Sequence, residues 1–309
     1  MMVRFALAFV MMVGSVTAQT QDAAPAVAAD KPLPAIGPLL LEVEKNQDAA
    51  EKMQHDYTYH VHAEQQELDG KDNVRKTTIT DSESVTISGV RVDRVVARDG
   101  KPLTPEEAKK ESDKIDKEVA RDKERRAKAE GNGKSTDAEG HDELSVSRIL
   151  QLGTFSNPRR VTLNDRPTIV ADYAGDSNAK TKNRFETMFR DLVGTVWIDE
   201  VDRALVQVQG HFLNDFKIGG GLIADVKKDS SFSAKMTKVN GEAWLPEEFD
   251  GQGKIRVLLF AGFSGRVKLV TSDYRKFRAS ATIVGGGQVV GDDGKPVPEA
   301  GPEPDKQKP

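Results

Sequence analysis

Short segments in which apolar and polar residues alternate recur along most of this chain. In residues 57–64 the odd-numbered positions hold Tyr, Tyr, Val and Ala, and the even-numbered positions hold Thr, His, His and Glu. This period of two is typical of a strand with one buried face and one wet face. Strands of a parallel sheet, by contrast, read as continuous apolar runs. The pattern therefore favours a mostly antiparallel sheet and argues against a doubly wound fold.

The same reasoning predicts about ten strands and four helices in one α+β domain with a long, strongly curved sheet. The expected strands cover residues 57–64, 75–80, 85–88, 91–98, a hairpin within 158–171 around Asn164–Asp165, 195–199, 204–210, 222–227, 231–239, 242–246, 254–260 and 268–277, and Gly251 and Gly253 are expected to mark a turn. The expected helices cover about 38–54, 104–130, 142–151 and 184–193. The last of these places apolar residues at i, i+3, i+4 and i+7, which is the clearest amphipathic pattern in the chain.

A charged insertion at 104–140 interrupts this domain. Thr104 and Glu107 predict a capping box, with Pro105 at the first helical position. The helix that follows has only a thin apolar stripe, formed by Ala108, Ile115 and Val119. We expect a helix that projects into solvent. A docking arm for a protein partner is the alternative.

The ends of the chain differ in composition from the domain at 36–284. Residues 1–18 have a short positive start, an apolar stretch and a small-residue exit, which predict a secretory signal peptide. Residues 19–35 form an Ala/Pro-rich flexible lead-in, and 285–309 are expected to form a disordered tail. No later apolar stretch is long enough to span a bilayer. The expected product is soluble and exported, in the periplasm of a Gram-negative-type bacterium.

Composition excludes several kinds of chemistry. The chain has no cysteine, so disulfides, thiol catalysis, zinc held by cysteine and lipid attachment through cysteine are excluded. Its formal net charge of -4 gives no indication of nucleic-acid binding. The glycine runs fit no phosphate-binding motif, and residues 262–266 lack the second glycine of a serine-hydrolase elbow. We expect no cofactor and no enzymatic activity.

Two pairs of polar residues are candidates for functional sites. His60 and His62 share one strand face about 7 Å apart and would need a third ligand to hold zinc. Two histidines on the solvent face of an ordinary strand are the favoured interpretation, and no metal site is predicted. Asp199 and Asp202 flank a hairpin turn, where Asp is favoured by local hydrogen bonding.

Aromatic side chains concentrate in the C-terminal strands and in the 184–193 helix. Such side chains form either a core between sheet and helix or the lining of an apolar groove beneath a movable helix, and the sequence does not separate these two structures. The residues predicted to line a groove are Phe185, Met188, Phe189, Trp197, Phe212, Trp244 and Phe260.

The order of elements resembles a known group of exported proteins. A leader and a helix precede Tyr-Thr-Tyr-His-Val at 57–61, and a Val-Trp-Ile-Asp hairpin at 196–199 precedes further strands and Tyr-Arg-Lys-Phe at 274–277. This resembles the outer-membrane lipoprotein-sorting protein group, and in particular uncharacterised exported members with a stretch like that at 95–107. The resemblance covers about residues 36–280. It implies an unclosed half-barrel with helices over the concave face and binding of lipid or acyl chains.

These observations lead to two hypotheses of function. The first is a periplasmic, non-enzymatic, chaperone-like protein that holds a lipid or a lipoprotein acyl chain between the sheet and the 184–193 helix. The second is a cell-envelope interaction or sensor domain with a filled core, which binds a protein partner through the helix at 104–130.

Overall fold

The computed structural model describes residues 31–69, 71, 73–131, 145–182, 186–218, 224–257, 260–276, 282–284 and 288–290. The chain divides into a larger unit, 1–275, and a smaller unit, 276–309. The expected signal peptide and nearly all of the lead-in therefore lie outside the described residues, so export stays a prediction.

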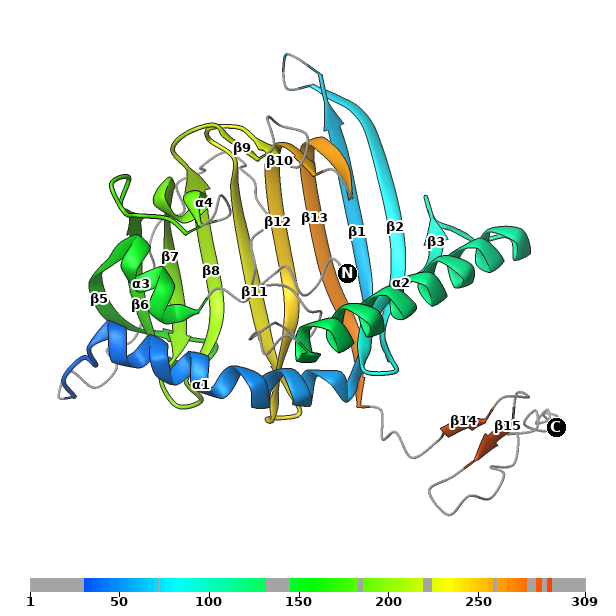
Figure 1. Ribbon diagram of the computed structural model, residues 1–309, viewed down its shortest axis with the longest axis horizontal. Coiled ribbons are helices and arrows are strands. Elements are labelled where there is room, and N and C mark those ends of the chain that lie inside the picture. Colours follow the sequence, from blue (N-terminus) through cyan, green and yellow to red (C-terminus); the bar gives the residue numbers. More distant parts are fainter. Residues whose placement is uncertain are drawn as a thin grey trace, which may run out of the picture. The chain divides into compact units, whose positions relative to one another are not determined.

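One open sheet dominates the larger unit (Figure 1). Its strands are β1 (Tyr57–Leu68), β2 (Val74–Ile87), β3 (Val90–Arg98), β4 (Lys101–Pro102), β5 (Gly153–Leu163), β6 (Arg166–Gly175), β7 (Leu192–Asp199), β8 (Ala204–Phe212), β9 (Phe216–Ile218), β10 (Ala224–Val226), β11 (Ser231–Val239), β12 (Ala243–Val257) and β13 (Phe260–Lys276). The order is β4-β3-β2-β1-β13-β12-β11-β8-β7-β6-β5, with β9 and β10 branching from β12. The pairs from β4 to β1 and from β13 to β5 are antiparallel. The predicted unclosed, antiparallel sheet is confirmed.

Turn chemistry sets the register where the sequence signal is strong. Asn164 and Asp165 both have positive φ, 50° and 58°, and join β5 to β6 in a two-residue hairpin, as predicted. The expected turn at Gly251 and Gly253 is wrong. Both residues lie inside β12, where Gly251 pairs with Phe232 on one side and Val267 on the other. The predicted strands 242–246 and 254–260 are therefore parts of one long strand.

Four helices are present among the described residues: α1 (Ile36–His55), α2 (Pro105–Gly131), α3 (Val146–Leu152) and α4 (Thr187–Arg190). The prediction of a long amphipathic helix at 184–193 is wrong in the described part. Leu192 and the residues after it join the sheet, where β7 pairs with both β6 and β8. Pairing on both sides overrides the helical spacing of the apolar residues, so α4 is a single turn.

α1 packs its apolar stripe on the lower ends of β6, β7 and β8. Leu39 and Leu40 are buried against Ile169 and Ile198, together with the part of α3 that includes Leu150. We call the face of the sheet that carries α1, α3 and α4 the inner face. Burying four such side chains contributes roughly 1.5–3 kcal/mol each, so the helix is held by its packing.

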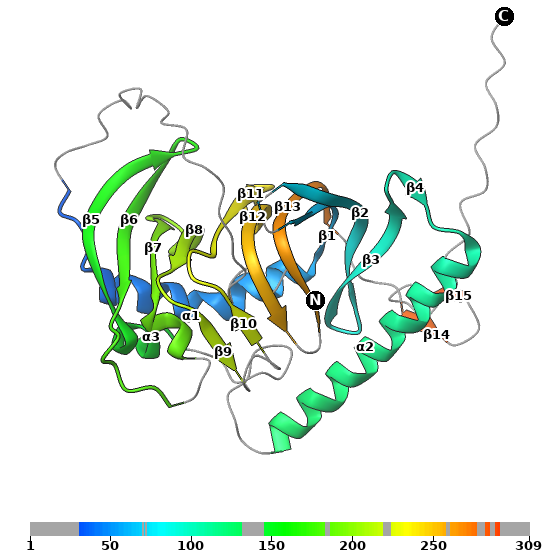
Figure 2. The ribbon, with the colours of Figure 1, turned by 90° about the horizontal axis from the view of Figure 1, so that it is seen from above.

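α2 lies against the opposite face of β2 and β3. On β3, Arg91 points toward α1 and donates a hydrogen bond to the carbonyl oxygen of Gln54. The alternate residue Val92 contacts Ile115 and Val119 of α2 instead. Figure 2 shows α2 running past β3 on the side away from α1. Because successive strand residues point to opposite faces, the two helices cover different faces.

The expected solvent-projecting helix is therefore docked along its middle. The Thr104–Glu107 capping box is formed, as predicted, with the Thr104 N–H donating to Glu107 at 2.9 Å. Ile115 and Val119 are only 5% and 8% exposed. The thin stripe is enough to seat the helix, because it meets fully buried valines of β3.

We expect an Ile115→Ala substitution to loosen α2 without unfolding the sheet. Removing this side chain costs about 2 kcal/mol of the local packing, so backbone amides of α2 should exchange roughly thirtyfold faster. Hydrogen exchange followed by mass spectrometry measures this. Ser112→Ala, on the exposed face of the helix, is the control, and equal exchange in both variants would contradict the docking.

The smaller unit contains one hairpin. β14 (Thr282–Val284) pairs antiparallel with β15 (Gln288–Val290). A strand therefore occurs inside the segment 285–309, which the sequence predicts to be a disordered tail.

Candidate functional site

The inner face carries one continuous apolar cluster that extends over six neighbouring strands. Cross-strand neighbours place the side chains together: Ala234 pairs with Phe249, and Phe249 pairs with Leu269. We call this set the inner cluster. Its buried members are Leu152, Tyr173, Ala179, Met188, Phe189, Leu192, Phe212, Phe216, Val226, Phe232, Ala234, Phe249, Val267 and Leu269.

A glycine makes room for one of the aromatic rings. Gly210 pairs with Phe232 across β8 and β11, and a Cβ placed on Gly210 would lie 3.1 Å from the Phe232 ring. The missing side chain lets the ring lie across the neighbouring strand. This is a role for glycine that does not depend on its backbone angles.

Two short helices cover the β5–β8 end of the inner cluster, and a buried ion pair fastens them together. Arg148 of α3 donates to both oxygens of Glu186, at 2.8 Å from Nε and 2.6 Å from Nη2. The hydrogen bonds from Arg148 hold the pKa of Glu186 below its usual range. This pair, together with the Glu186–Lys182 backbone hydrogen bond of 2.6 Å, fixes α3 relative to α4.

α4 sits closely on the end of β6. The Tyr173 hydroxyl donates to the carbonyl oxygen of Phe189 at 3.1 Å, and burial raises the pKa of Tyr173. A Cβ on Gly175 would lie 2.1 Å from the same carbonyl oxygen. Only glycine permits this approach, so α4 is held by backbone contact as well as by its apolar side chains.

The described helices cover the ends of the inner face and leave its middle without one. Figure 1 shows α1 along the lower ends of the strands and α3 and α4 over the β5–β8 end. Within the described residues, no helix lies over the upper halves of β11, β12 and β13 in this view. The apolar side chains of those strands face the same side as the inner cluster.

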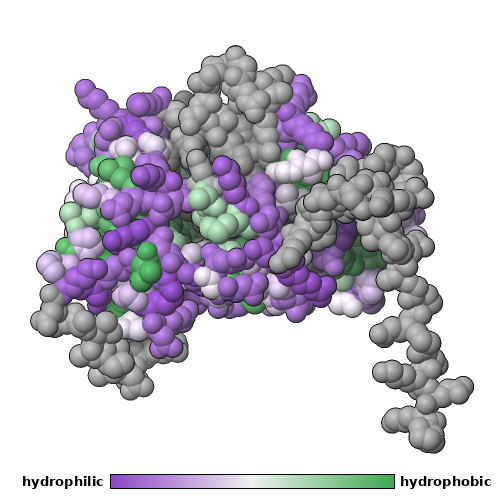
Figure 3. Space-filling view, turned by 90° about the horizontal axis from the view of Figure 1, so that it is seen from below, coloured by the Kyte–Doolittle hydropathy of each residue, from purple (hydrophilic) through white to green (hydrophobic). Residues whose placement is uncertain are grey.

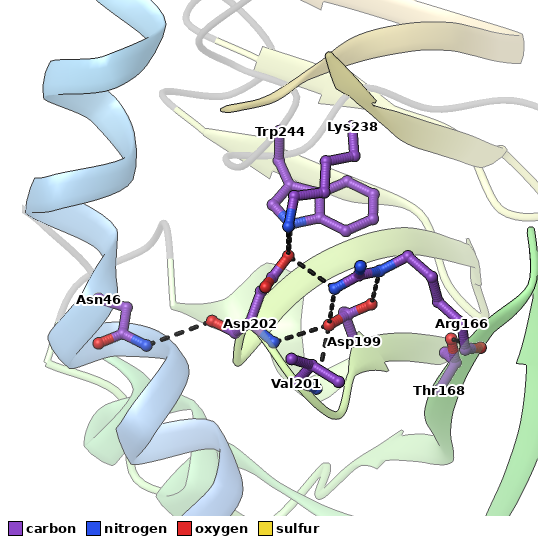
Figure 4. Close-up of polar contacts among 8 residues, drawn as sticks. All are labelled: Asn46, Arg166, Thr168, Asp199, Val201, Asp202, Lys238 and Trp244. Atoms are coloured by element: carbon purple, nitrogen blue, oxygen red, sulfur yellow. Dashed lines mark hydrogen bonds and ion pairs between the residues drawn. The ribbon is translucent and has the colours of Figure 1, made fainter. Parts of the chain in front are cut away.

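A polar network fixes the lower hairpins and α1 in place (Figure 4). Arg166 donates to both oxygens of Asp199, which is 1% exposed, and pairs with Asp202 at 2.8 Å. Lys238 and the Trp244 indole bind the same Asp202 oxygen, at 2.6 and 2.9 Å. We call these five residues the hairpin clamp. Figure 4 also shows Asn46 of α1 reaching the backbone of Asp202.

The clamp extends the turn role predicted for Asp199 and Asp202. Asp199 accepts hydrogen bonds from the backbone N–H groups of Val201 and Asp202, at 3.0 and 2.7 Å, as a turn aspartate does. The ion pairs to strands β6 and β11 were not predicted. They join residues 33 and 36 positions apart, a separation for which the sequence contains no signal.

The face of β11, β12 and β13 that is opposite the inner face is charged, and we call it the outer face. Lys235 of β11 and Lys268 of β13 both bind Glu248 of β12, at 2.8 and 3.1 Å. The hydrogen bond from Lys235 is the main cause that lowers the pKa of Glu248 to about 2. Figure 3, seen from below, shows apolar residues as separate spots on a mostly hydrophilic surface. On β11, β12 and β13 the charged side chains Lys235, Glu248 and Lys268 thus alternate with members of the inner cluster and lie on the opposite face.

We expect Glu248→Gln to remove a pH-dependent part of the stability. A carboxyl group whose pKa is depressed on folding stabilises above its unfolded value, 4.5, and loses that contribution as pH falls toward about 2. The wild type should therefore exceed E248Q in free energy of unfolding at pH 7, and the difference should vanish near pH 2. Urea titrations across this range measure it. Glu83→Gln, in an exposed pair with Arg94, should show a much smaller change, and a pH-independent difference for E248Q would be contradictory.

His60 and His62 lie on this outer face with a shared partner. His60 Nε2 is 3.2 Å and His62 Nδ1 is 2.8 Å from the same Asp81 oxygen, and the hydrogen bond with His62 is the main cause that lowers the pKa of Asp81. Within the described residues, no group of three or more His, Cys, Asp or Glu side chains is arranged to hold a metal ion.

The predicted groove residues divide into three groups. Met188, Phe189 and Phe212 belong to the inner cluster, with exposures of 8%, 5% and 0%. Trp244 lies in the hairpin clamp. Trp197 points to the other face, since its neighbours Val196 and Ile198 pack under α1. Phe185 and the side chain of Phe260 lie outside the described part of the chain.

Sequence reasoning left several inner-cluster members out of the predicted groove. Phe232, Ala234 and Phe249 occupy alternate positions on β11 and β12 and face the same side. Their alternation with Ser233, Lys235 and Glu248 is the signal that finds them. Tyr173 and Leu269 can be identified as members of the inner cluster only through their cross-strand partners. Those partners are known only once the order of the strands in the sheet is known.

None of the described helices is long and apolar enough to cross a membrane. No protein-family model matches the chain, and no curated protein matches its sequence.

Solved structures similar to the chain include members of the group that the sequence resembles. A structure described as an outer membrane lipoprotein-sorting protein domain, from Vibrio parahaemolyticus, is 9% identical, covers 80% of this chain and 95% of its own, and has a TM-score of 0.31. A LolA superfamily protein from Nitrosomonas europaea is 8% identical, with coverages of 76% and 93% and a TM-score of 0.24. A DUF1329 family protein from Desulfovibrio piger is 7% identical, with coverages of 77% and 94% and a TM-score of 0.24. At these identities and TM-scores the similarity carries no information on ligand or activity.

Proposed function

We propose that this chain is a non-enzymatic binding protein that takes up an apolar ligand, a lipid or an acyl chain, on the inner face of its sheet. The observation that carries the proposal is the inner cluster: one continuous apolar face of an open sheet, with described helices only over its ends. Burial of each methylene group of a ligand contributes about 0.8 kcal/mol. A chain of about twelve carbons therefore offers enough to exceed the cost of association.

The helices at the two ends of the inner face are held in different ways. α1 is held to the sheet by the hairpin clamp, through Asn46, and by Arg91 at its C-terminal end. α3 and α4 are only 7 and 4 residues long and are joined by the Arg148–Glu186 pair. Side chains of the inner cluster are buried beneath them, so a chain that enters over β11, β12 and β13 reaches the β5–β8 end only if these two helices shift.

Titration with a fluorescent fatty acid tests the proposal. Residues 19–309 should bind the probe saturably, with roughly micromolar affinity or better, and unlabelled palmitate should displace it. Native mass spectrometry should show a one-to-one adduct. A folded protein, verified by circular dichroism, that binds no probe and carries no adduct would contradict the proposal.

The second hypothesis, a protein-interaction domain, is favoured by the burial of the described inner-cluster residues. In that case α2 would supply the contact through its exposed charges, such as Lys109 and Asp113. Deletion of 104–140 is a poor test, because it uncovers Val90 and Val92 of β3. Reversal of the exposed charges keeps the helix docked, and loss of an envelope partner in a pull-down would then support this function.

A further inference from the structure

Arg190 is a cation placed at the border of the inner cluster. It is the last residue of α4 and directly follows Met188 and Phe189, which are both buried in the cluster. Its Nη1 donates to the carbonyl oxygen of Ala179 at 3.3 Å. Its Nε is buried and has no hydrogen-bond partner among the residues that the structure describes. Within the described residues, Arg190 forms no ion pair.

Three other arginines near the β5–β8 end of the sheet have anionic partners. Arg148, Arg160 and Arg166 bind Glu186, Glu200 and Asp199, each through at least two nitrogen atoms. Arg148 also donates to the carbonyl oxygen of Lys180, the residue after the one that Arg190 binds. The guanidinium groups of Arg148 and Arg190 thus both bind the backbone at residues 179–180. Within the described residues, Arg148 has a carboxylate partner and Arg190 has none. A buried donor that lacks an acceptor is unfavourable, so this arrangement has an unused anion-binding capacity.

We propose that Arg190 binds the anionic head group of an amphiphile whose acyl chain lies on the inner face. This inference rests on the proposed function and narrows it to one ligand class. The planar guanidinium can offer Nε–H and Nη–H together to two oxygens of a carboxylate or phosphate. Ala179, whose carbonyl oxygen Arg190 binds, is itself a member of the inner cluster, so a head group bound by Arg190 would lie at the border of apolar side chains that can receive the first methylene groups. Fatty acids and anionic phospholipids share this chemistry.

The first test uses the wild-type protein and ligands with equal chains. Isothermal titration at pH 8 compares dodecanoate with dodecan-1-ol, and includes acetate and inorganic phosphate as anions without a chain. We expect dodecanoate to bind about tenfold more tightly than the alcohol, as a charge-assisted hydrogen bond implies. Acetate and phosphate should not bind at the same concentrations.

The second test changes the arginine. Arg190→Gln should remove the tenfold preference and leave the affinity for dodecan-1-ol within about twofold. Arg190→Lys should keep a part of the preference, because it retains the charge and loses the fork. Arg121→Gln removes one positive charge from the exposed surface of α2 and should leave the preference intact. The comparison of ligands on the wild type remains decisive if R190Q does not fold.

The outcomes separate the two proposals. Equal affinities for dodecanoate and the alcohol, or a preference that R190Q retains, would overturn the role of Arg190 and leave chain binding standing. Binding of acetate or phosphate as tight as that of dodecanoate would show a free-anion site and would also overturn it. If neither dodecanoate nor the alcohol binds, the proposed function itself fails.

Discussion

Gly265→Ala should destabilise the protein by at least about 4 kcal/mol, a loss at the extreme of single substitutions. Gly265 lies in β13, where this strand runs beside β1 and joins the N-terminal and C-terminal parts of the sheet. A Cβ there would lie 1.7 Å from the carbonyl oxygen of Gln66, and the residue has a φ of +156°. Because the obstructing atom belongs to the backbone, no side-chain rotation relieves the clash. Chemical denaturation, or failure of the variant to fold, measures the effect.

A second glycine isolates the contribution of the backbone angle. Gly241 has a φ of +70°, and nothing lies within 4 Å of the position of its Cβ. Gly241→Ala should therefore cost only about 1 kcal/mol, the penalty for alanine at positive φ. If the two variants lost similar stability, the close approach of β13 to β1 would not be the reason for Gly265.

Arg166→Met should have the second largest effect, a loss of about 3–5 kcal/mol. Asp199 is buried and receives two hydrogen bonds from this guanidinium, which also pairs with Asp202. Removal of Arg166 leaves Asp199 buried without its cation, and the methionine cannot replace those hydrogen bonds. Urea denaturation at pH 7 measures the change in the free energy of unfolding.

The exposed edge of the same region supplies the matched control. Arg159 pairs with Asp172 at 3.2 Å, but the two side chains are 47% and 35% exposed. Arg159→Met should change stability by less than about 1 kcal/mol, as is usual for surface ion pairs. A loss for R166M as small as that for R159M would mean that the hairpin clamp does not support the fold.

Local patterns predicted most of the strands, the β5–β6 turn and the sheet type. Alternation identified β1 and β11, and the Asn164–Asp165 turn identified the β5–β6 hairpin, because each signal lies within a few residues. The remaining structure depends on pairing between residues that are far apart in the sequence. Leu192 has helical spacing with Phe189 and Met188, yet it pairs with Phe212 in the sheet. No local pattern reports that a partner strand stands on each side.

The residues predicted to line a groove overlap only partly with the inner cluster. Phe212 and Phe189 belong to it, whereas Trp197 points to the opposite face because its neighbours Val196 and Ile198 pack under α1. The short stripe at Ile115 was too thin to predict a docked helix, since its partners on β3 lie in a separate strand. Arg190 carries no sequence signal at all. Its significance depends on which acceptors the fold places around it.

The most direct test of ligand binding to the inner face is photo-crosslinking with a fatty acid that carries a diazirine near the end of its chain. Neighbouring residues of β11 and β12 point to opposite faces, so peptide mapping at single-residue resolution distinguishes the two surfaces. We predict adducts on Phe232, Ala234 and Phe249, which palmitate should suppress by competition. Adducts spread equally over Ser233, Lys235 and Glu248 on the outer face, or labelling that palmitate does not reduce, would contradict the account.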